Sequence, residues 1–197
     1  MNHNIPYLED LFDTKNISYV EVQHLYEPDL FSITAKKVIL EGEHCGRPYC
    51  DCEYENIEIG TLIPDGTLEL TFCEDFNEEI NDLPNSLTHL KFGRNFNKPI
   101  NYLPINLTHL TFHYRTNFNQ PVENLPNNLT HLELWGDFNQ ELNHLPDCLI
   151  YLALGPRFTK KLSNLPLSIK TIRLHEHYCE DISFLYDRGV KIIRYKF

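Results

Sequence analysis

Apolar and polar residues alternate over short segments that recur through most of the chain. In one segment Leu90 and Phe92 alternate with the polar residues His89 and Lys91, which is the pattern of a strand with one buried face. The same apolar pair returns as Leu70 and Phe72, Leu110 and Phe112, Leu132 and Leu134, Leu152 and Leu154, and Ile172 and Leu174. The pattern therefore predicts a series of short strands that share one buried face.

Between these strands the apolar residues fall at uneven spacing. Phe96, Ile100 and Leu103 follow the strand that ends at Phe92, through a stretch too short and too rich in turn residues for a regular helix. Pro104 then closes the unit, because proline fixes φ and biases the preceding residue to an extended form.

This unit repeats along the chain. The spacings between its prolines are 20, 20, 22, 20 and 20 residues, at Pro64, Pro84, Pro104, Pro126, Pro146 and Pro166. Such a period matches one coil of a solenoid, which buries its apolar face only when neighbouring coils stack on it. Stacking places equivalent strands side by side at roughly 4.8 Å. We predict a repeat solenoid of 20–22-residue coils, with one parallel β-sheet and little regular helix.

The repeats divide the chain into three regions. Residues 1–62 are expected to form a mixed N-terminal cap and first coil, residues 63–174 the repeats, and residues 175–197 a C-terminal capping coil. Alternating residues predict further strands at 17–22 and 37–40 in the cap and at 190–195 in the last coil. The two extra residues of the longest repeat lie in 113–117, where we expect a longer loop at a strand exit.

Asparagine adds a second regularity, because Asn77, Asn97, Asn119 and Asn139 each follow a repeat phenylalanine. A stacked column of amides can satisfy backbone groups at the corners of successive coils. The alternative is a row of amides that reads a ligand. Position 159 is Thr, so we expect the column to weaken there.

One consensus runs through the repeats: Leu-Pro-x-x-Leu-Thr-His-Leu-x-Phe, followed by Phe-Asn-x-Pro-Ile. Residues 83–100 and 103–122 match it best, and the copy at 138–141 lacks the proline. The pattern resembles the FNIP repeat, a short relative of the leucine-rich repeat that is abundant in social amoebae and in giant viruses of amoebae. The resemblance covers about residues 63–174. It implies a leucine-rich-repeat-like solenoid that binds proteins and implies no catalytic activity. Some members carry an F-box before the repeats, which would make them substrate adaptors of ubiquitin ligases.

Composition narrows the class of partner. At 197 residues and 42% hydrophobic, the chain has ample material for the core of one domain. A net charge of −11 argues against nucleic acid and an anionic membrane as partners. The chain has no run of 18 apolar residues and does not open like a signal peptide, so we expect a cytoplasmic protein, in the host cytoplasm or virion if viral. Six scattered cysteines fit reduced thiols.

One cluster of metal-ligating residue types lies outside the repeats: His44, Cys45, Cys50 and Cys52. Three thiols and an imidazole could give four tetrahedral ligands to zinc, although the spacing differs from that of common zinc knuckles. A disulfide between Cys45 and Cys50 is a second interpretation, and free thiols on a surface loop are the third. We expect no metal and no cofactor.

The residues that alternate with the buried ones form columns on the outer face of the sheet. We predict that partner binding uses this face, through His89, Lys91, His109, His131, Glu133, Trp135, Tyr151 and Arg173. The histidine column suggests a metal site or a pH switch, and a stacked ladder that is simply part of the repeat is the alternative. Trp135, the only tryptophan, is expected to be exposed there as an interface anchor.

The sequence therefore predicts a non-enzymatic module that binds a protein partner through the sheet face or the strand-exit loops. No Ser-His-Asp set, phosphate loop or HExxH motif supports an enzyme. A structural, self-assembling component, for example of a viral particle, is the alternative, because poorly capped solenoids can stack end to end. We expect a monomer or weak self-association.

Overall fold

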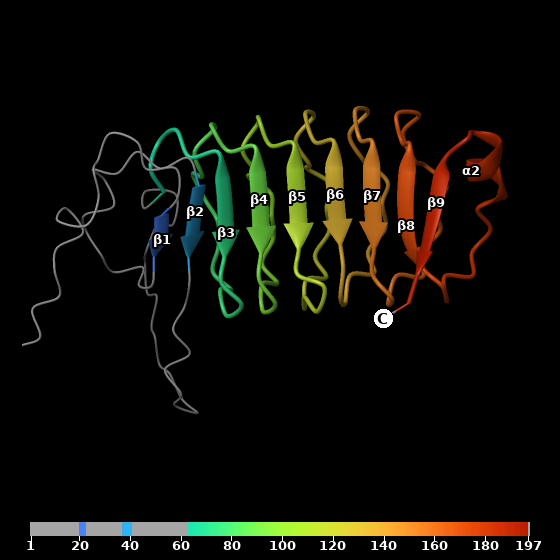
Figure 1. Cartoon of the computed structure of the whole chain (residues 1–197), viewed down its shortest axis with the longest axis horizontal. Helices are drawn as coiled ribbons and strands as arrows, with labels where there is room; N and C mark the ends of the chain where they lie inside the picture. Colours follow the sequence, from blue (N-terminus) through green and yellow to red (C-terminus); the bar gives the residue numbers. More distant parts are fainter. Residues whose placement is uncertain (1–19, 23–36, 41–62, 197) are drawn as a thin grey trace, which may run out of the picture.

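The computed structural model describes residues 20–22, 37–40 and 63–196. Within these residues nine strands form one parallel sheet, in which each strand pairs with the next along the chain (Figure 1). The strands are β1 Val20–Val22, β2 Lys37–Leu40, β3 Glu69–Phe72, β4 His89–Phe92, β5 His109–Phe112, β6 His131–Leu134, β7 Tyr151–Leu154, β8 Thr171–His175 and β9 Lys191–Tyr195. The helix α2, Ser183–Asp187, lies in the last coil. The predicted solenoid with one parallel sheet is confirmed.

Strand pairing follows the repeat. His89 of β4 pairs with His109 of β5, one 20-residue coil later, and His109 pairs with His131 of β6 across the 22-residue coil. The two additional residues are absorbed after β5, where Tyr114 is 47% exposed and Thr116 is fully buried. The predicted longer loop is confirmed.

The core is a stack of equivalent side chains. Successive repeat phenylalanines lie with their ring centroids 5.9 to 6.2 Å apart, from Phe76 through Phe96, Phe118 and Phe138 to Phe158. Tyr178 continues the column at 5.9 Å from Phe158. A coil thus buries its ring only between two neighbours, which makes each coil depend on the next.

The asparagine column links the coils in the predicted way. The backbone N–H of Asn97 donates to Oδ1 of Asn77 at 2.8 Å, and the same bond recurs at 3.0 Å from Asn119 to Asn97 and at 2.9 Å from Asn139 to Asn119. We expected the asparagine column to weaken at Thr159, but the link between Thr159 and Asn139 is kept. The Thr159 N–H donates to Asn139 Oδ1 at 3.0 Å and its hydroxyl donates to the same atom at 3.2 Å. These amide oxygens accept hydrogen bonds from the backbone of the next coil, which favours a structural role over ligand binding.

Both ends of the sheet extend past the clean repeats. β1 and β2 fall inside the segments expected to be strands, and β9 forms within the predicted last rung at 190–195. Leu185 of α2 is fully buried, so the short helix packs on the last coil. The rest of the expected N-terminal cap lies outside the described residues.

Candidate interaction surface

The residues that alternate with the core line the outer face of the sheet. His89 and Lys91 of β4 are exposed, and the outward residues of β5 and β6 at 109, 111, 131 and 133 are half-buried. Tyr151 and Arg173 are half-buried as well. The structure thus brings seven of the eight predicted partner-binding residues to one accessible face.

Three histidines on this face form a stacked ladder. The rings of His89 and His109 lie 4.1 Å apart at an interplanar angle of 12°, and those of His109 and His131 lie 4.2 Å apart at 7°. Tyr151 extends the column at 5.6 Å. The predicted column is therefore a packed stack of rings that runs across four strands.

A threonine fixes each ring. The hydroxyl of Thr108 donates to the carbonyl oxygen of Thr88 in the preceding coil at 3.0 Å and lies 2.9 Å from Nδ1 of His109. Since the hydroxyl proton is used on the carbonyl, the Nδ1–H of His109 donates to the hydroxyl oxygen. The same pair of contacts recurs at Thr88 and Thr130. The repeated Thr-His dipeptide therefore sets one tautomer.

That tautomer leaves a lone pair on Nε2 of each ring. In the described part of the chain no residue bonds these Nε2 atoms, and no buried side-chain nitrogen or oxygen there lacks a partner, so the three atoms reach solvent. Burial, and then the neighbouring rings of His89 and His131, lower the pKa of His109 to about 4. His109, in the middle of this row of rings, is therefore a neutral hydrogen-bond acceptor at pH 7.

A single metal ion does not suit this row. Lone pairs on parallel stacked rings point the same way, whereas ligands of one ion must converge on it. Among the residues described, no group of three or more His, Cys, Asp or Glu side chains could hold a metal ion. The candidate ligands His44, Cys45, Cys50 and Cys52 lie outside the described residues.

Trp135 corrects one prediction. We expected it to be exposed, but only 6% of its surface is accessible. Its Nε1–H donates to Oε2 of Glu133 at 2.7 Å, the Arg173 guanidinium lies 5.2 Å from its ring centroid, and the Tyr195 ring meets it edge-on at 5.3 Å. Trp135 lies on the outer side of the sheet, yet other outer side chains cover it.

Small residues in the intervening strand make this burial possible. Trp135 follows β6 and Arg173 belongs to β8, so the two side chains meet over the exit end of β7, where the outward residue Ala153 is followed by Gly155 just past the strand. Ala153 is fully buried although it points outward. A Cβ on Gly155 would lie 2.7 Å from the Trp135 carbonyl carbon, so only glycine fits. Tyr195 completes the cover by donating from its hydroxyl to the Leu154 carbonyl at 2.8 Å.

Sequence reasoning missed Tyr195 as part of this cluster. The available signal was the pair of smallest outward residues, Ala153 and Gly155, in the coil directly after the tryptophan. Such a gap indicates that a large neighbour leans across it. The chain itself therefore covers Trp135 and Ala153 on the outer face, whereas the outward residues of β4 to β6 are exposed or half-buried.

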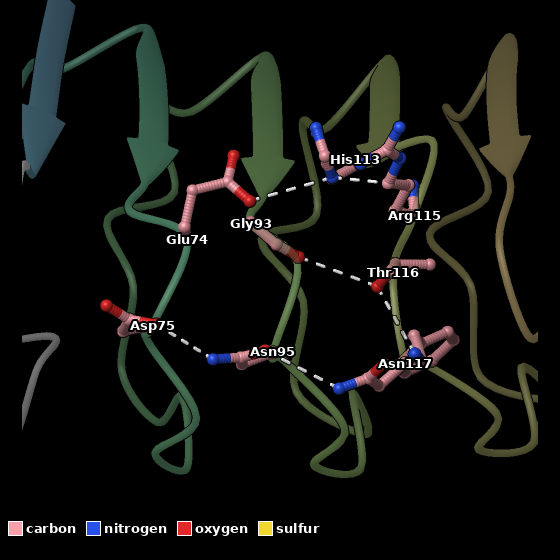
Figure 2. Close-up of polar contacts among 9 residues, drawn as sticks. Glu74, Asp75, Gly93, Asn95, His113, Arg115, Thr116 and Asn117 are labelled. Atoms are coloured by element: carbon pink, nitrogen blue, oxygen red, sulfur yellow. Dashed lines mark hydrogen bonds and ion pairs between the residues drawn. The ribbon is translucent and has the colours of Figure 1, made fainter. Parts of the chain in front are cut away.

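Two coils come into close backbone contact where β4 exits the sheet. A Cβ on Gly93 would come within 1.9 Å of the Cys73 carbonyl oxygen, so this position also requires glycine. Figure 2 shows His113, from the loop after β5, and Glu74, from the loop after β3, directed toward each other past Gly93. His113 Nδ1 lies 3.6 Å from Glu74 Oε2 and 3.4 Å from the Arg115 backbone nitrogen, which donates to it.

Positive side chains surround His113. Burial is the main cause that lowers its pKa, whereas the Glu74 carboxylate acts to raise it. Three nearby cations lower it further: Lys91, Arg115 and Arg94. We call Lys91, Arg94 and Arg115 the basic corner. The strand-exit loops were predicted to contribute to binding, but Arg94 and Arg115 were not singled out.

Comparison with known proteins agrees with the repeat architecture. A family model described as FNIP Repeat matches residues 76–115 and 118–144. The chain is also similar to a solved structure, the crystal structure of CroV588, described as a novel circular LRR protein. The two are 34% identical with a TM-score of 0.60, over 77% of this chain and 22% of that one. The chain thus spans less than a quarter of that relative. A search of curated proteins gave no match. None of the described helices is long and apolar enough to cross a membrane.

Proposed function

Because this chain contains FNIP repeats folded as a leucine-rich-repeat-like solenoid, we propose that it is a non-enzymatic module that binds a protein partner on the outer face of its sheet. The observation that carries the proposal is the open half of that face, from β4 to β6, where Lys91 and the histidine ladder reach solvent.

The ladder is organised before any partner arrives. Each ring is held by its neighbours and by a threonine, so binding freezes few additional rotamers. Ordering interface side chains is a main cost of association, and a rigid surface reduces it. Three aligned acceptors next to Tyr151 and Lys91 offer hydrogen bonds, aromatic area and charge to one partner.

The test is capture of a binding protein from native lysate by two matched variants. His109→Ala/Tyr151→Ala removes two rings from the ladder, and Tyr102→Ala/Tyr186→Ala removes two exposed aromatic rings elsewhere, at 73% and 59% exposure. We expect the first variant to lose most of the captured protein and the second to retain it, at unchanged thermal unfolding. Equal capture by both variants would contradict the proposed face.

Self-assembly is the second candidate, and the position of β9 favours it. Within the described residues β9 has a neighbour on one side only, and an edge strand can pair with another chain. The similar solved structure is described as circular, and this chain covers 22% of it. Light scattering against concentration separates the candidates, because an interaction module stays small without its partner.

A further inference from the structure

The basic corner is unusual in a chain with 28 acidic and 17 basic residues. Lys91, Arg94 and Arg115 come from two successive coils and are all exposed. In the part of the chain that the structure describes, none of them forms an ion pair. Exposed Arg157 and Lys196, by contrast, lie 3.1 and 2.9 Å from carboxylates. Within the described residues the three cations of the corner therefore have no carboxylate partner.

The backbone holds the two coils of the corner in contact. The Asn117 N–H donates to the Arg94 carbonyl at 2.8 Å. The Thr116 hydroxyl lies 3.5 Å from the Gly93 carbonyl (Figure 2). Thr116 is fully buried, so this contact anchors the loop after β5 on the loop after β4. The backbone contacts therefore fix where the three cationic residues start, and only their long side chains can move.

Asp75 and Glu74 are the acidic groups at the same corner. Asp75 Oδ1 accepts a hydrogen bond from Asn95 Nδ2 at 2.8 Å, in a row of side chains that continues to Asn117. Glu74 Oε2 lies 3.6 Å from His113 Nδ1, and the Glu74 side chain is 61% exposed. Neither carboxylate forms an ion pair with Lys91, Arg94 or Arg115 among the described residues.

The two-residue insertion adds an aromatic surface to this charge. Tyr114 is 47% exposed, its ring meets that of His113 at 4.3 Å, and the Arg115 guanidinium lies 5.2 Å from its centroid. Tyrosine and arginine are the residue types that contribute most to protein interfaces. The two-residue insertion thus places both in the loop whose Asn117 N–H bonds the Arg94 carbonyl.

We propose that the basic corner binds an acidic segment of the protein partner, with Lys91, Arg94 and Arg115 facing its carboxylates and Tyr114 lying against its chain. This inference rests on the proposed function, because Lys91 joins the corner to the open sheet face. A short acidic segment fits three clustered cations. A long polyanion such as nucleic acid would extend past them and be repelled by the chain, whose net charge is −11.

The probe is a short fluorescein-labelled peptide in which glutamate alternates with serine, titrated with the full chain and followed by fluorescence anisotropy. The corner variant is Lys91→Ala/Arg94→Ala/Arg115→Ala. The control variant, Lys161→Ala/Lys170→Ala/Lys191→Ala, removes the same charge from exposed positions in later coils. We expect the corner variant to bind about tenfold more weakly and the control within about twofold of wild type, with affinity falling as salt rises.

Both variants should keep the thermal unfolding of wild type, because no ion pair of the described residues is lost at the corner. A lysine-serine peptide should not bind. The proposal is overturned if the acidic peptide does not bind, or if both variants lose it equally. It is also overturned if oligothymidylate binds more tightly than the peptide and depends on the corner, or if the corner only mediates association between copies of this chain.

Different results would contradict the proposed sheet-face site and the proposed acidic-segment site. If peptide binding ignores the corner while His109→Ala/Tyr151→Ala still abolishes capture from lysate, only the acidic-segment inference is wrong. If the peptide binds at the corner while that ladder variant captures as wild type does, the sheet face is the wrong surface and the corner stands alone.

Discussion

At the residue scale, the size of one outward side chain decides what its neighbours can do. Gly93 lets the backbone at Cys73 and Glu74 come close, and Gly155 does the same for the backbone at Trp135, whose side chain is buried. Where the outward residues are all rings of similar size, as in the histidine ladder, they stack instead. The Thr-His dipeptide then fixes the tautomer, and the stack keeps His109 neutral.

The stacked ring of His109 should make stability depend on pH. Its pKa falls from an ordinary 6.5 to about 4 in the folded chain. Between these values the unfolded chain binds a proton that the folded chain refuses, so the free energy of unfolding falls as the pH falls through this window. Because the ring is only half-buried, solvent screening limits the loss to about 1 kcal/mol.

The measurement compares urea unfolding of wild type and His109→Tyr from pH 7 to pH 4. Tyrosine stands at the equivalent position 151, so it keeps a ring in the column without titrating there. The difference in unfolding free energy between the two proteins should shrink or reverse in favour of the variant as the pH falls. Parallel pH profiles would show that the stack does not shift the histidine.

At the scale of elements, β9 acts as a clamp as well as a terminal rung. Its register on β8 runs from Lys191 opposite Thr171 to Tyr195 opposite His175. From there the Tyr195 side chain reaches past β8 to the Leu154 carbonyl on β7 and closes the edge of the Trp135 cluster. One side chain thus ties three strands together on the outer face.

Tyr195→Phe removes only the hydroxyl and tests this clamp. The Leu154 carbonyl then loses its 2.8 Å donor in a part-buried site, which should lower the free energy of unfolding by about 1 kcal/mol. Tyr186→Phe, at a residue 59% exposed on α2, should leave stability unchanged. Fluorescence of Trp135, the only tryptophan, reports the same site and should shift to the red in Tyr195→Phe alone.

The sequence predicted the strands and their register better than it predicted contacts between side chains of different coils. Strand positions follow from a period-2 alternation that any one coil carries, and the register follows from the spacing of the coils. The burial of Trp135 depends on Arg173 and Tyr195, which lie 38 and 60 residues further along the chain, so no local pattern contains it. The basic corner was hidden for a related reason, since Lys91, Arg94 and Arg115 become neighbours only when the coils stack.

At the scale of the whole molecule, the outer face is divided. Beside β7 the chain's own Arg173 and Tyr195 cover Trp135, and from β4 to β6 the face presents the histidine ladder with the basic corner at the strand exits. A uniform stack of repeats therefore carries one covered cluster and one open surface. We therefore expect a partner to dock on the face from β4 to β6.

The most direct test of this central claim is site-specific photo-crosslinking in native lysate. Benzoylphenylalanine replaces either Thr111, on β5 in the middle of the open face, or Tyr102, which is 73% exposed in a turn away from the strands. The account predicts one dominant crosslinked protein from position 111 and none from position 102. A product from position 102 with position 111 silent, or equal yields from both, would contradict it.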